Sequence, residues 1–498
     1  MKKAHLFVCL ILLSFLFFPA RSLAERDDAS QELGARIKRV ENGLIPSPGI
    51  VVKGQPPGKA GLTERMKTYR VPGVSIAVIN GNDIEWEEGY GFQESGGTSP
   101  VTPDTLFQAA SISKPVAAAA ALYYVEKGIL GLDEDVNSRL RSWKVPENAW
   151  TKKGRVTLRG LLSHTAGITV SGFPGYAEGK ERPTLKQILD GAKPANTPPI
   201  KVDIEIGSRF RYAGGGYAIL QQLLTDVLGR PFPFIMRDAV FIKLDMSQST
   251  YEQPLPQALA GRSASGHRAN GSVIPGRWHT YPEMAAAGLW TTPTDLALFA
   301  REIMLAKEGK SDRLLSQVMV ELMLSPVKEG VGLGLFVKGS GQDLQFSHSG
   351  GNEGFRCHMM VYPERGQGAV VMTNGDLGGE LLMEILHSLA AEYGWPDFLP
   401  LEKETVDVAA AELEALAGTY QFTPADKVKV TVGNGCLFAE PVFVPPDGKA
   451  RCVFYAESAL SFFSTETDIT LTFSKDAAGK VTGMTLGRGE NKRKARKL

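Results

Sequence analysis

The sequence of 498 residues predicts an α/β protein with a large mixed domain and a small all-β module at its carboxyl end. Strand-like and helix-like segments are mixed along the chain as far as Tyr393. After about Glu404 the pattern changes to short β-rich runs separated by Gly, Asn, Asp and Pro. The composition, 43% hydrophobic and 22% charged, is that of a folded globular chain and not of a disordered one.

The amino terminus has the pattern of a secretory signal. Lys2 and Lys3 precede Leu6–Phe18, an apolar stretch interrupted only by a serine, and Ser22-Leu23-Ala24 offers small residues for cleavage. The stretch is shorter than the 20 or so residues of a membrane span, so an uncleaved anchor is the lesser alternative. We expect residues 1–24 to be removed after Ala24 and the protein to be periplasmic or secreted. The net charge then moves from +1 to −2, because the leader holds three bases and no acid.

The large domain is expected at residues 61–395, after a helical and polar lead-in at 25–60. Hydrophobic periodicity and turn residues predict its elements in order. The expected strands are 73–79, 84–91, 333–338, 355–362 and 369–373, and the expected helices are 116–127, 216–228, 295–307 and 380–393.

A linker at 396–409 is expected to lead into the β module at 410–498. In an oxidising compartment Cys436 and Cys452 could pair there, whereas Cys357 is interpreted as a buried structural thiol. The basic run 492–497 is interpreted as a solvated last strand or a frayed end. With a net charge near zero, the chain offers no electrostatic case for binding nucleic acid.

The most informative motif for chemistry is Ser111-Ile112-Ser113-Lys114, which has the form S-x-x-K and precedes an alanine-rich helix. Residues three apart share a helix face, so Lys114 is expected close to the Ser111 hydroxyl. The amino end of the helix adds backbone N–H groups and partial positive charge. Both would stabilise an oxyanion formed when the serine attacks.

Two further segments support a site around Ser111. Tyr212 precedes three glycines and a helix, and a nearby Lys114 would favour its phenolate form, which makes it a candidate general base. The segment 346–352, which contains His348-Ser349-Gly350-Gly351, lies before an expected strand. Its small residues on an edge strand would let an extended substrate lie beside it, and a backbone N–H there could complete an oxyanion hole.

Other candidate motifs are interpreted as structural. His164 lies in a Ser-His-Thr turn, and His267 and His279 lie in loops. No metal-binding His or Cys spacing, no dinucleotide-binding glycine pattern and no G-x-S-x-G motif occurs, so we expect neither a metal nor a cofactor.

Ser111, Lys114, Tyr212 and His348-Ser349-Gly350, in this order, resemble the class C β-lactamase and penicillin-binding-protein-like superfamily of serine hydrolases. The segments 161–167 and 287–293 agree with it, and the resemblance covers roughly residues 60–395. It implies an antiparallel sheet flanked by helices, with a helical lobe and a barrel-like carboxy-terminal β domain of the kind that some relatives carry.

The resemblance also implies a role for each matching residue. Ser111 is the nucleophile, Lys114 its activator and Tyr212 the base. The Ser111 and Gly351 N–H groups form the oxyanion hole, and Ser349 and Gly350 line the substrate strand. His348 replaces the lysine of K-T-G and either holds a substrate carboxylate or bonds to Tyr212.

Two departures bear on the substrate. The asparagine of Y-x-N is Gly214, and the permanent charge of K-T-G becomes a titratable histidine. Both favour an ester or a D-aminoacyl peptide, including peptidoglycan-type substrates, over a β-lactam. The alternative is a slow penicillin-binding or peptidoglycan-sensing protein that uses the same cleft.

Overall fold

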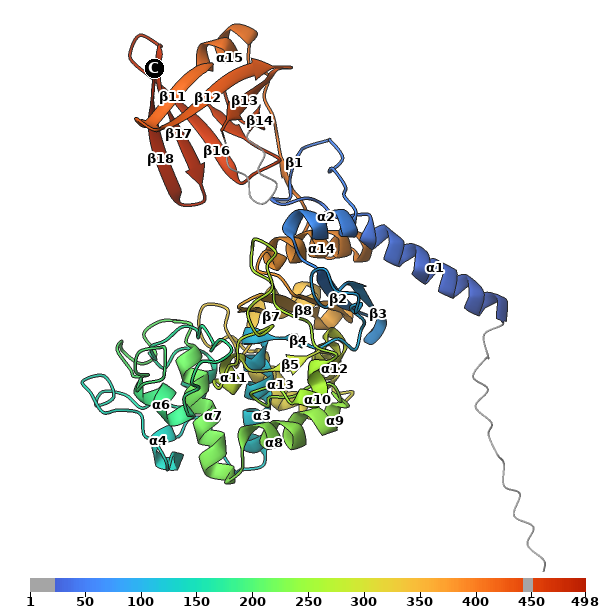
Figure 1. Cartoon of the computed structure of the whole chain (residues 1–498), viewed down its shortest axis with the longest axis vertical. Helices are drawn as coiled ribbons and strands as arrows, with labels where there is room; N and C mark the ends of the chain where they lie inside the picture. Colours follow the sequence, from blue (N-terminus) through green and yellow to red (C-terminus); the bar gives the residue numbers. More distant parts are fainter. Residues whose placement is uncertain (1–22, 442–450) are drawn as a thin grey trace, which may run out of the picture.

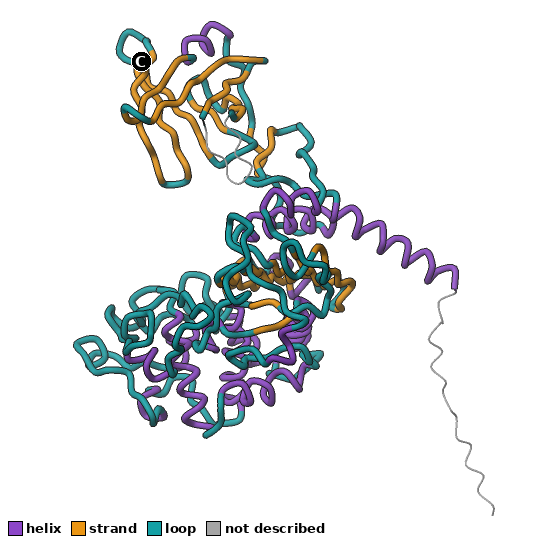
Figure 2. The backbone as a smooth tube through the Cα atoms, viewed as in Figure 1, coloured by secondary structure: helices purple, strands orange, loops and turns teal. Residues whose placement is uncertain are grey.

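The computed structural model describes residues 23–441 and 451–498 (Figure 1). All but the last two residues of the expected signal peptide lie outside the described ranges. Those two residues begin helix α1 (Leu23–Glu41). The chain forms a large body of helices around a central sheet, and a separate β domain lies at the carboxyl end of the chain (Figure 2).

The central sheet has six antiparallel strands in the order β3-β2-β9-β8-β7-β6. Since β2 pairs with β9, the sheet joins the two ends of the domain. Its strands are β2 (Gly73–Asn80), β3 (Asp83–Gly91), β6 (Phe336–Lys338), β7 (Gln345–Asn352), β8 (Phe355–Tyr362) and β9 (Gln367–Thr373).

The two faces of the sheet belong to two different hydrophobic cores. Val74, Ile76 and Val78 of β2 pack with helices α14 (Gly378–Tyr393), α2 (Leu62–Tyr69) and α1, while the alternate Ala77 and Ile79 face the helical lobe. The period of two in β2 therefore gives a strand that is apolar on both faces and central in the fold.

The helical lobe surrounds α3 (Ser113–Glu126), whose residues from Ser113 to Leu122 are all buried. Its alanines let the neighbouring helices approach closely. The other elements of the domain are β4 (Phe107–Gln108), β5 (Trp290–Thr291), η1 (Ala110–Ile112), α4 (Val136–Arg139), α5 (Leu158–Leu162), α6 (Leu185–Asp190), α7 (Gly214–Leu228), α8 (Phe232–Met236), η2 (Arg237–Phe241), α9 (Ile242–Leu244), α10 (Gln257–Ala260), α11 (Met284–Ala287), α12 (Pro293–Lys307), α13 (Gln317–Leu324), η3 (Gly341–Asp343) and η4 (Pro363–Arg365).

The carboxy-terminal domain is a closed antiparallel barrel, capped by α15 (Ala410–Leu416). The basic run at the end of the chain is its last strand, which closes the barrel by pairing with both the first strand and the seventh. The strands are β11 (Gly418–Thr423), β12 (Asp426–Gly433), β13 (Cys436–Glu440), β14 (Cys452–Ala456), β15 (Ser461–Phe463), β16 (Ile469–Lys475), β17 (Val481–Arg488) and β18 (Asn491–Lys497).

The barrel register explains why Cys436 and Cys452 are not joined by a disulfide. Cys452 lies opposite Ala439, three residues along β13 from Cys436. At about 3.3 Å per residue this is roughly 10 Å, beyond the Cα spacing of at most about 7 Å that a disulfide needs.

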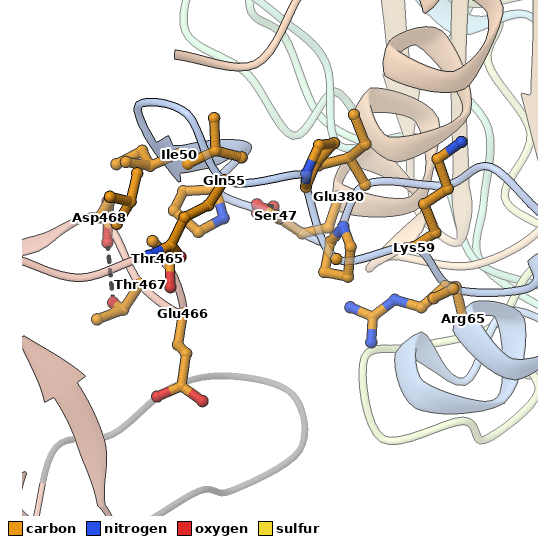
Figure 3. Close-up of a pocket in the computed structure, with 18 of the residues that line it drawn as sticks. Ser47, Ile50, Gln55, Lys59, Arg65, Glu380, Thr465, Glu466, Thr467 and Asp468 are labelled. Carbon is orange, nitrogen blue, oxygen red and sulfur yellow. Dashed lines mark hydrogen bonds between the residues drawn. The ribbon is translucent and has the colours of Figure 1, made fainter. Parts of the chain in front are cut away.

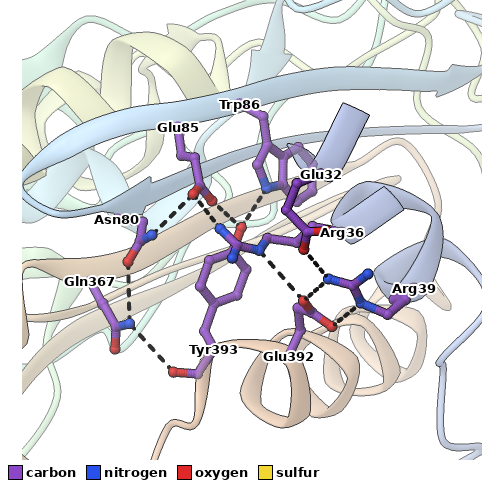
Figure 4. Close-up of polar contacts among 9 residues, drawn as sticks. All are labelled: Glu32, Arg36, Arg39, Asn80, Glu85, Trp86, Gln367, Glu392 and Tyr393. Carbon is purple, nitrogen blue, oxygen red and sulfur yellow. Dashed lines mark hydrogen bonds and ion pairs between the residues drawn. The ribbon is translucent and has the colours of Figure 1, made fainter. Parts of the chain in front are cut away.

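Two features attach the lead-in to the rest of the chain. Arg36 of α1 pairs with Glu85 of β3 and Glu392 of α14, and Arg39 also pairs with Glu392 (Figure 4). Beyond α1, β1 (Ile50–Val52) runs parallel to β10 (Leu401–Lys403).

A cavity of about 750 Å³ lies between this lead-in and the barrel (Figure 3). Ser47, Lys59 and Glu380 line one side of it, and Thr465 and Asp468 line the other. None of the residues predicted for catalysis lines this cavity.

The predicted fold class is confirmed: a sheet flanked by helices, a helical lobe and a carboxy-terminal β barrel. His348–Gly351 lie inside strand β7, directly ahead of β8, because Phe346–Asn352 all pair with β8 despite their serines and glycines. Because β6 pairs with Gln345–Ser347 of β7, the expected edge-strand position holds from His348 onward.

Candidate active site

Ser111 and Lys114 meet at the start of α3, as the S-x-x-K spacing predicts. The Nζ of Lys114 donates to Ser111 Oγ at 3.0 Å and to the carbonyl of Ala286 in α11 at 2.7 Å. Lys114 is only 2% exposed. Two hydrogen bonds therefore fix the ammonium group, and they hold it against the serine hydroxyl.

The turn that carries Ser111 is held in an unusual conformation. Ala110 has a φ of 48°, in the left-handed region that non-glycine residues rarely occupy. Ser113 Oγ donates to the Ala110 carbonyl at 2.5 Å and accepts from Leu289 N at 3.0 Å. These contacts hold the strained turn, and with it the orientation of the Ser111 side chain.

Tyr212 lies beside the lysine. The Lys114 Nζ is 5.0 Å from the centre of the Tyr212 ring. The His164 ring packs on Tyr212 with centroids 4.5 Å apart, and the ring of Phe336 stacks at 6.5 Å with an interplanar angle of 13°. The structure thus brings Tyr212 and the Ser111–Lys114 pair into one aromatic-lined site.

Two of the three glycines after Tyr212, Gly214 and Gly215, are closely packed. A Cβ on Gly214 would lie 3.0 Å from Phe173 Cε2, and a Cβ on Gly215 would lie 2.5 Å from the Thr169 carbonyl oxygen. Phe173 therefore approaches the position where the asparagine of Y-x-N would begin.

Strand β7 forms another wall of the site. A Cβ on Gly350 would lie 2.3 Å from the Ala109 carbonyl oxygen, so the strand lies directly against the turn that carries Ser111. Strand β6 pairs only with Gln345–Ser347. From His348 onward, the edge of β7 that faces away from β8 has no strand neighbour among the described residues. Ser349 and Gly351 in this part of β7 are exposed. This open edge fits an extended substrate.

His348 is buried in this wall with 3% of its surface exposed. Its Nδ1 donates to the Ser349 carbonyl at 2.7 Å, since a carbonyl oxygen can only accept. Burial and the charge of Lys114 lower the pKa of His348 to about 3. Its Nε2, a buried acceptor in this tautomer, has no hydrogen-bond partner among the residues that the structure describes.

The neighbouring residues of β8 alternate as expected. Cys357 is buried and donates through Sγ to the Ala109 carbonyl at 3.0 Å, while His358 lies on the opposite face and contacts Ser349 Oγ through Nδ1 at 2.8 Å. Burial raises the pKa of the Cys357 thiol and lowers the pKa of His358 to about 4. The thiol is a packing residue, as predicted.

Three contributors to the site were not anticipated from the sequence. They are the Ala286 carbonyl, the Phe336 ring and His164, which we interpreted as purely structural. The Ser-His-Thr segment was a usable signal for His164, whereas nothing local marks Ala286 or Phe336. In contrast, the ring of His267 hydrogen-bonds to Ser95 N and to the Asn374 carbonyl, which are structural contacts.

The described part of the chain contains no cluster of three or more His, Cys, Asp or Glu side chains that could hold a metal ion. Within the same ranges, no helix is both long and apolar enough to cross a membrane.

A serine hydrogen-bonded to a lysine three residues later, on a helix against an antiparallel sheet, defines a serine hydrolase of the β-lactamase and penicillin-binding-protein type. The sequence profile of the Beta-lactamase family matches residues 60–391. The chain belongs to this family.

Known relatives agree with this assignment. Penicillin-binding protein 4 of Amycolatopsis lactamdurans is 28% identical over 379 residues, covering 71% of this chain and 94% of the relative. A D-aminopeptidase of Gluconobacter oxydans is 24% identical over 357 residues, covering 70% and 63%. The octameric penicillin-binding protein homologue of Pyrococcus abyssi shares the fold with a TM-score of 0.60 and 20% identity, covering 87% of this chain and 98% of that one.

Proposed function

We propose that this protein is a secreted hydrolase that cleaves D-aminoacyl peptides or esters through an acyl intermediate on Ser111. The observation that carries the proposal is the 3.0 Å hydrogen bond from Lys114 Nζ to Ser111 Oγ. A buried ammonium at this distance favours the alkoxide over the hydroxyl and so activates the serine.

The acylation step uses three groups. Ser111 Oγ attacks the substrate carbonyl while its proton passes to the Tyr212 phenolate, and the resulting Tyr212 hydroxyl protonates the leaving amine or alcohol. The Ser111 and Gly351 N–H groups stabilise the oxyanion. In deacylation Tyr212 takes a proton from water, which attacks the ester, and the Tyr212 hydroxyl then returns this proton to Ser111 Oγ as the acid product leaves. The closeness of Lys114 Nζ to the Tyr212 ring, 5.0 Å from its centre, supports Tyr212 as the group that takes the serine proton.

The state of His348 supports the proposed substrate class. At neutral pH its imidazole is uncharged and its Nε2 only accepts, so it suits a donor such as an amide N–H, a hydroxyl or an ammonium group. It does not offer the positive charge that would attract the carboxylate of a β-lactam. The D-aminopeptidase relative is consistent with a D-aminoacyl substrate.

A substrate panel with the purified protein tests the proposal. D-alanine p-nitroanilide, its L enantiomer, p-nitrophenyl acetate and a chromogenic cephalosporin should be hydrolysed with kcat/KM highest for the D-aminoacyl substrate or the ester. A fluorophosphonate probe should label the wild type and Ser272→Ala, a surface variant, but not Ser111→Ala. Unchanged labelling of Ser111→Ala would overturn the nucleophile assignment.

A slow penicillin-binding sensor is the second candidate, because Phe173 crowds the position of the missing asparagine. Turnover beyond one equivalent of product per protein molecule distinguishes the enzyme from the sensor. Secretion is tested separately: the amino-terminal sequence of the exported protein should begin at Glu25.

A further inference from the structure

His164 holds the peptide groups on both sides of Tyr212. Its carbonyl oxygen accepts from Arg211 N at 2.9 Å, and its Nδ1 accepts from Ala213 N at 3.0 Å. Its ring also packs on the ring of Tyr212, with centroids 4.5 Å apart and planes inclined by 32°. One residue therefore restrains the backbone before Tyr212, the backbone after it and the side chain itself.

The backbone of His164 makes this double contact possible. His164 follows the end of α5 with a φ of 59°, in the left-handed region, and its N–H still bonds to the Leu161 carbonyl. This sharp turn lets its carbonyl and ring bond to alternate residues of the same segment. A non-glycine residue held there is a strained feature that the surroundings must maintain.

The chemistry of the ring is equally restricted. Because Nδ1 accepts from an N–H, the neutral ring carries its proton on Nε2. The ring is buried, 4% exposed, and packs against Phe210 and Tyr217 at 5.9 and 5.4 Å. Burial, with the charge of Lys114, holds the pKa of His164 well below its ordinary value, so the acceptor persists through the physiological range.

We propose that His164 is a positioning residue that sets the place of Tyr212 relative to Lys114 and Ser111. It rests on the proposed role of Tyr212 as the base. In the described part of the chain, the hydrogen bonds and ring contacts of His164 go to the Tyr212 segment and its neighbours and not to Ser111, so we place its action on Tyr212. The 5.0 Å separation of Lys114 Nζ from the Tyr212 ring is the geometry that it maintains.

Matched substitutions separate this role from general packing. The side-chain oxygen of asparagine takes nearly the place of Nδ1, and asparagine tolerates the left-handed backbone. Glutamine instead reaches the place of Nε2. We expect His164→Asn to keep the fluorophosphonate labelling rate of Ser111 within about threefold, while His164→Gln and His164→Ala lower it by tenfold or more.

A double-mutant cycle gives the decisive readout, and it needs no known substrate. If His164 acts only through Tyr212, His164→Gln should slow labelling at least tenfold in the wild type but less than twofold in Tyr212→Phe. Equal losses in both backgrounds, or a loss in His164→Asn as large as in His164→Ala with all variants folded by thermal melting, would overturn the proposal. If Tyr212→Phe alone leaves labelling and hydrolysis unchanged, the proposed role of Tyr212 itself fails, which is a separate result.

Discussion

His348 donates its Nδ1 proton to the carbonyl of Ser349, the next residue of the same strand, at 2.7 Å. This contact leaves Nε2 as a buried acceptor that is exposed to the charge of Lys114, at the position that matches the lysine of the K-T-G motif in the sequence resemblance. The site thus has a buried positive charge, Lys114, bonded to the proposed nucleophile Ser111, and an uncharged histidine in strand β7.

This arrangement makes the stability of the protein depend on pH through His348. The pKa of His348 is lowered to about 3 in the folded state, while an unfolded histidine titrates near 6.5. The unfolded state therefore binds the proton first, and stability is lost as the pH falls from about 6.5 toward 3. We expect the free energy of unfolding of the wild type to fall relative to His348→Asn by about 3–5 kcal/mol across this window.

Urea unfolding at pH 7.5, 6, 5 and 4 measures the effect. His279→Asn is the matched control, because His279 lies in a loop, is partly exposed, and its ring Nδ1 bonds to the Pro174 carbonyl. If the free energies of unfolding of the wild type and His348→Asn change with pH in parallel, His348 is not held neutral in the folded state.

Lys114→Met tests the activation of Ser111. Methionine has nearly the length of lysine and suits a buried position, but it removes the ammonium that bonds to Ser111 Oγ and to the Ala286 carbonyl. We expect kcat/KM for the best substrate to fall by about 10³-fold or more, within or above the range of general acid–base contributions. Stopped-flow labelling and far-UV circular dichroism should show a slow but folded enzyme. Labelling at the wild-type rate would contradict the role of Lys114.

Gly214→Asn restores the Y-x-N motif and tests whether packing excludes it. The new side chain meets Phe173 Cε2 at 3.0 Å and the Ser171 carbonyl oxygen at 3.1 Å already at its Cβ. We expect Gly214→Asn to lower the free energy of unfolding by about 1–3 kcal/mol, the usual range for overpacking. Adding Phe173→Ala should recover part of this loss and speed acylation by a cephalosporin, measured as product burst. If Gly214→Asn alone is as stable as the wild type, Phe173 can move aside without a cost in stability.

The sequence predicted the parts of the site that depend on short spacing. The three-residue interval of Ser111 and Lys114 brings them together because α3 begins there, and β8 and β9 follow from runs of apolar residues. The contacts that distinguish this site join residues distant in the chain: Lys114 with Ala286, Tyr212 with His164, and Gly214 with Phe173. No local pattern encodes such pairs, because each depends on how the lobe packs around α3.

The disulfide that Cys436 and Cys452 could have formed also depends on contacts between distant parts of the chain. Both cysteines lie in the β module, as the composition suggested, but the register of β13 and β14 separates them. A register is set by the whole barrel, so it could not be deduced from the spacing of two residues.

Glu283 gives a pH dependence opposite to that of His348. It immediately precedes α11, the helix whose Ala286 carbonyl receives Lys114, and it is fully buried. Burial raises the pKa of its carboxyl group to about 7, and the nearby Tyr176 hydroxyl offsets only part of this effect. An unfolded glutamate titrates near 4.3, so the unfolded state loses its proton first as the pH rises.

The contribution of Glu283 to the free energy of unfolding is therefore fully present below about pH 4.3. It is lost as the pH rises from there to about 7. Glu283→Gln cannot ionise, and we expect it to be more stable than the wild type by about 3 kcal/mol at pH 8 but not at pH 4.5. Glu302→Gln is the matched control: Glu302 is also buried but accepts from Ser311 Oγ and Leu314 N, so its replacement should give no gain at either pH. Urea unfolding at pH 4.5 and pH 8 measures these differences in the free energy of unfolding. If Glu283→Gln is no more stable than the wild type at pH 8, other groups of the folded state stabilise the Glu283 carboxylate.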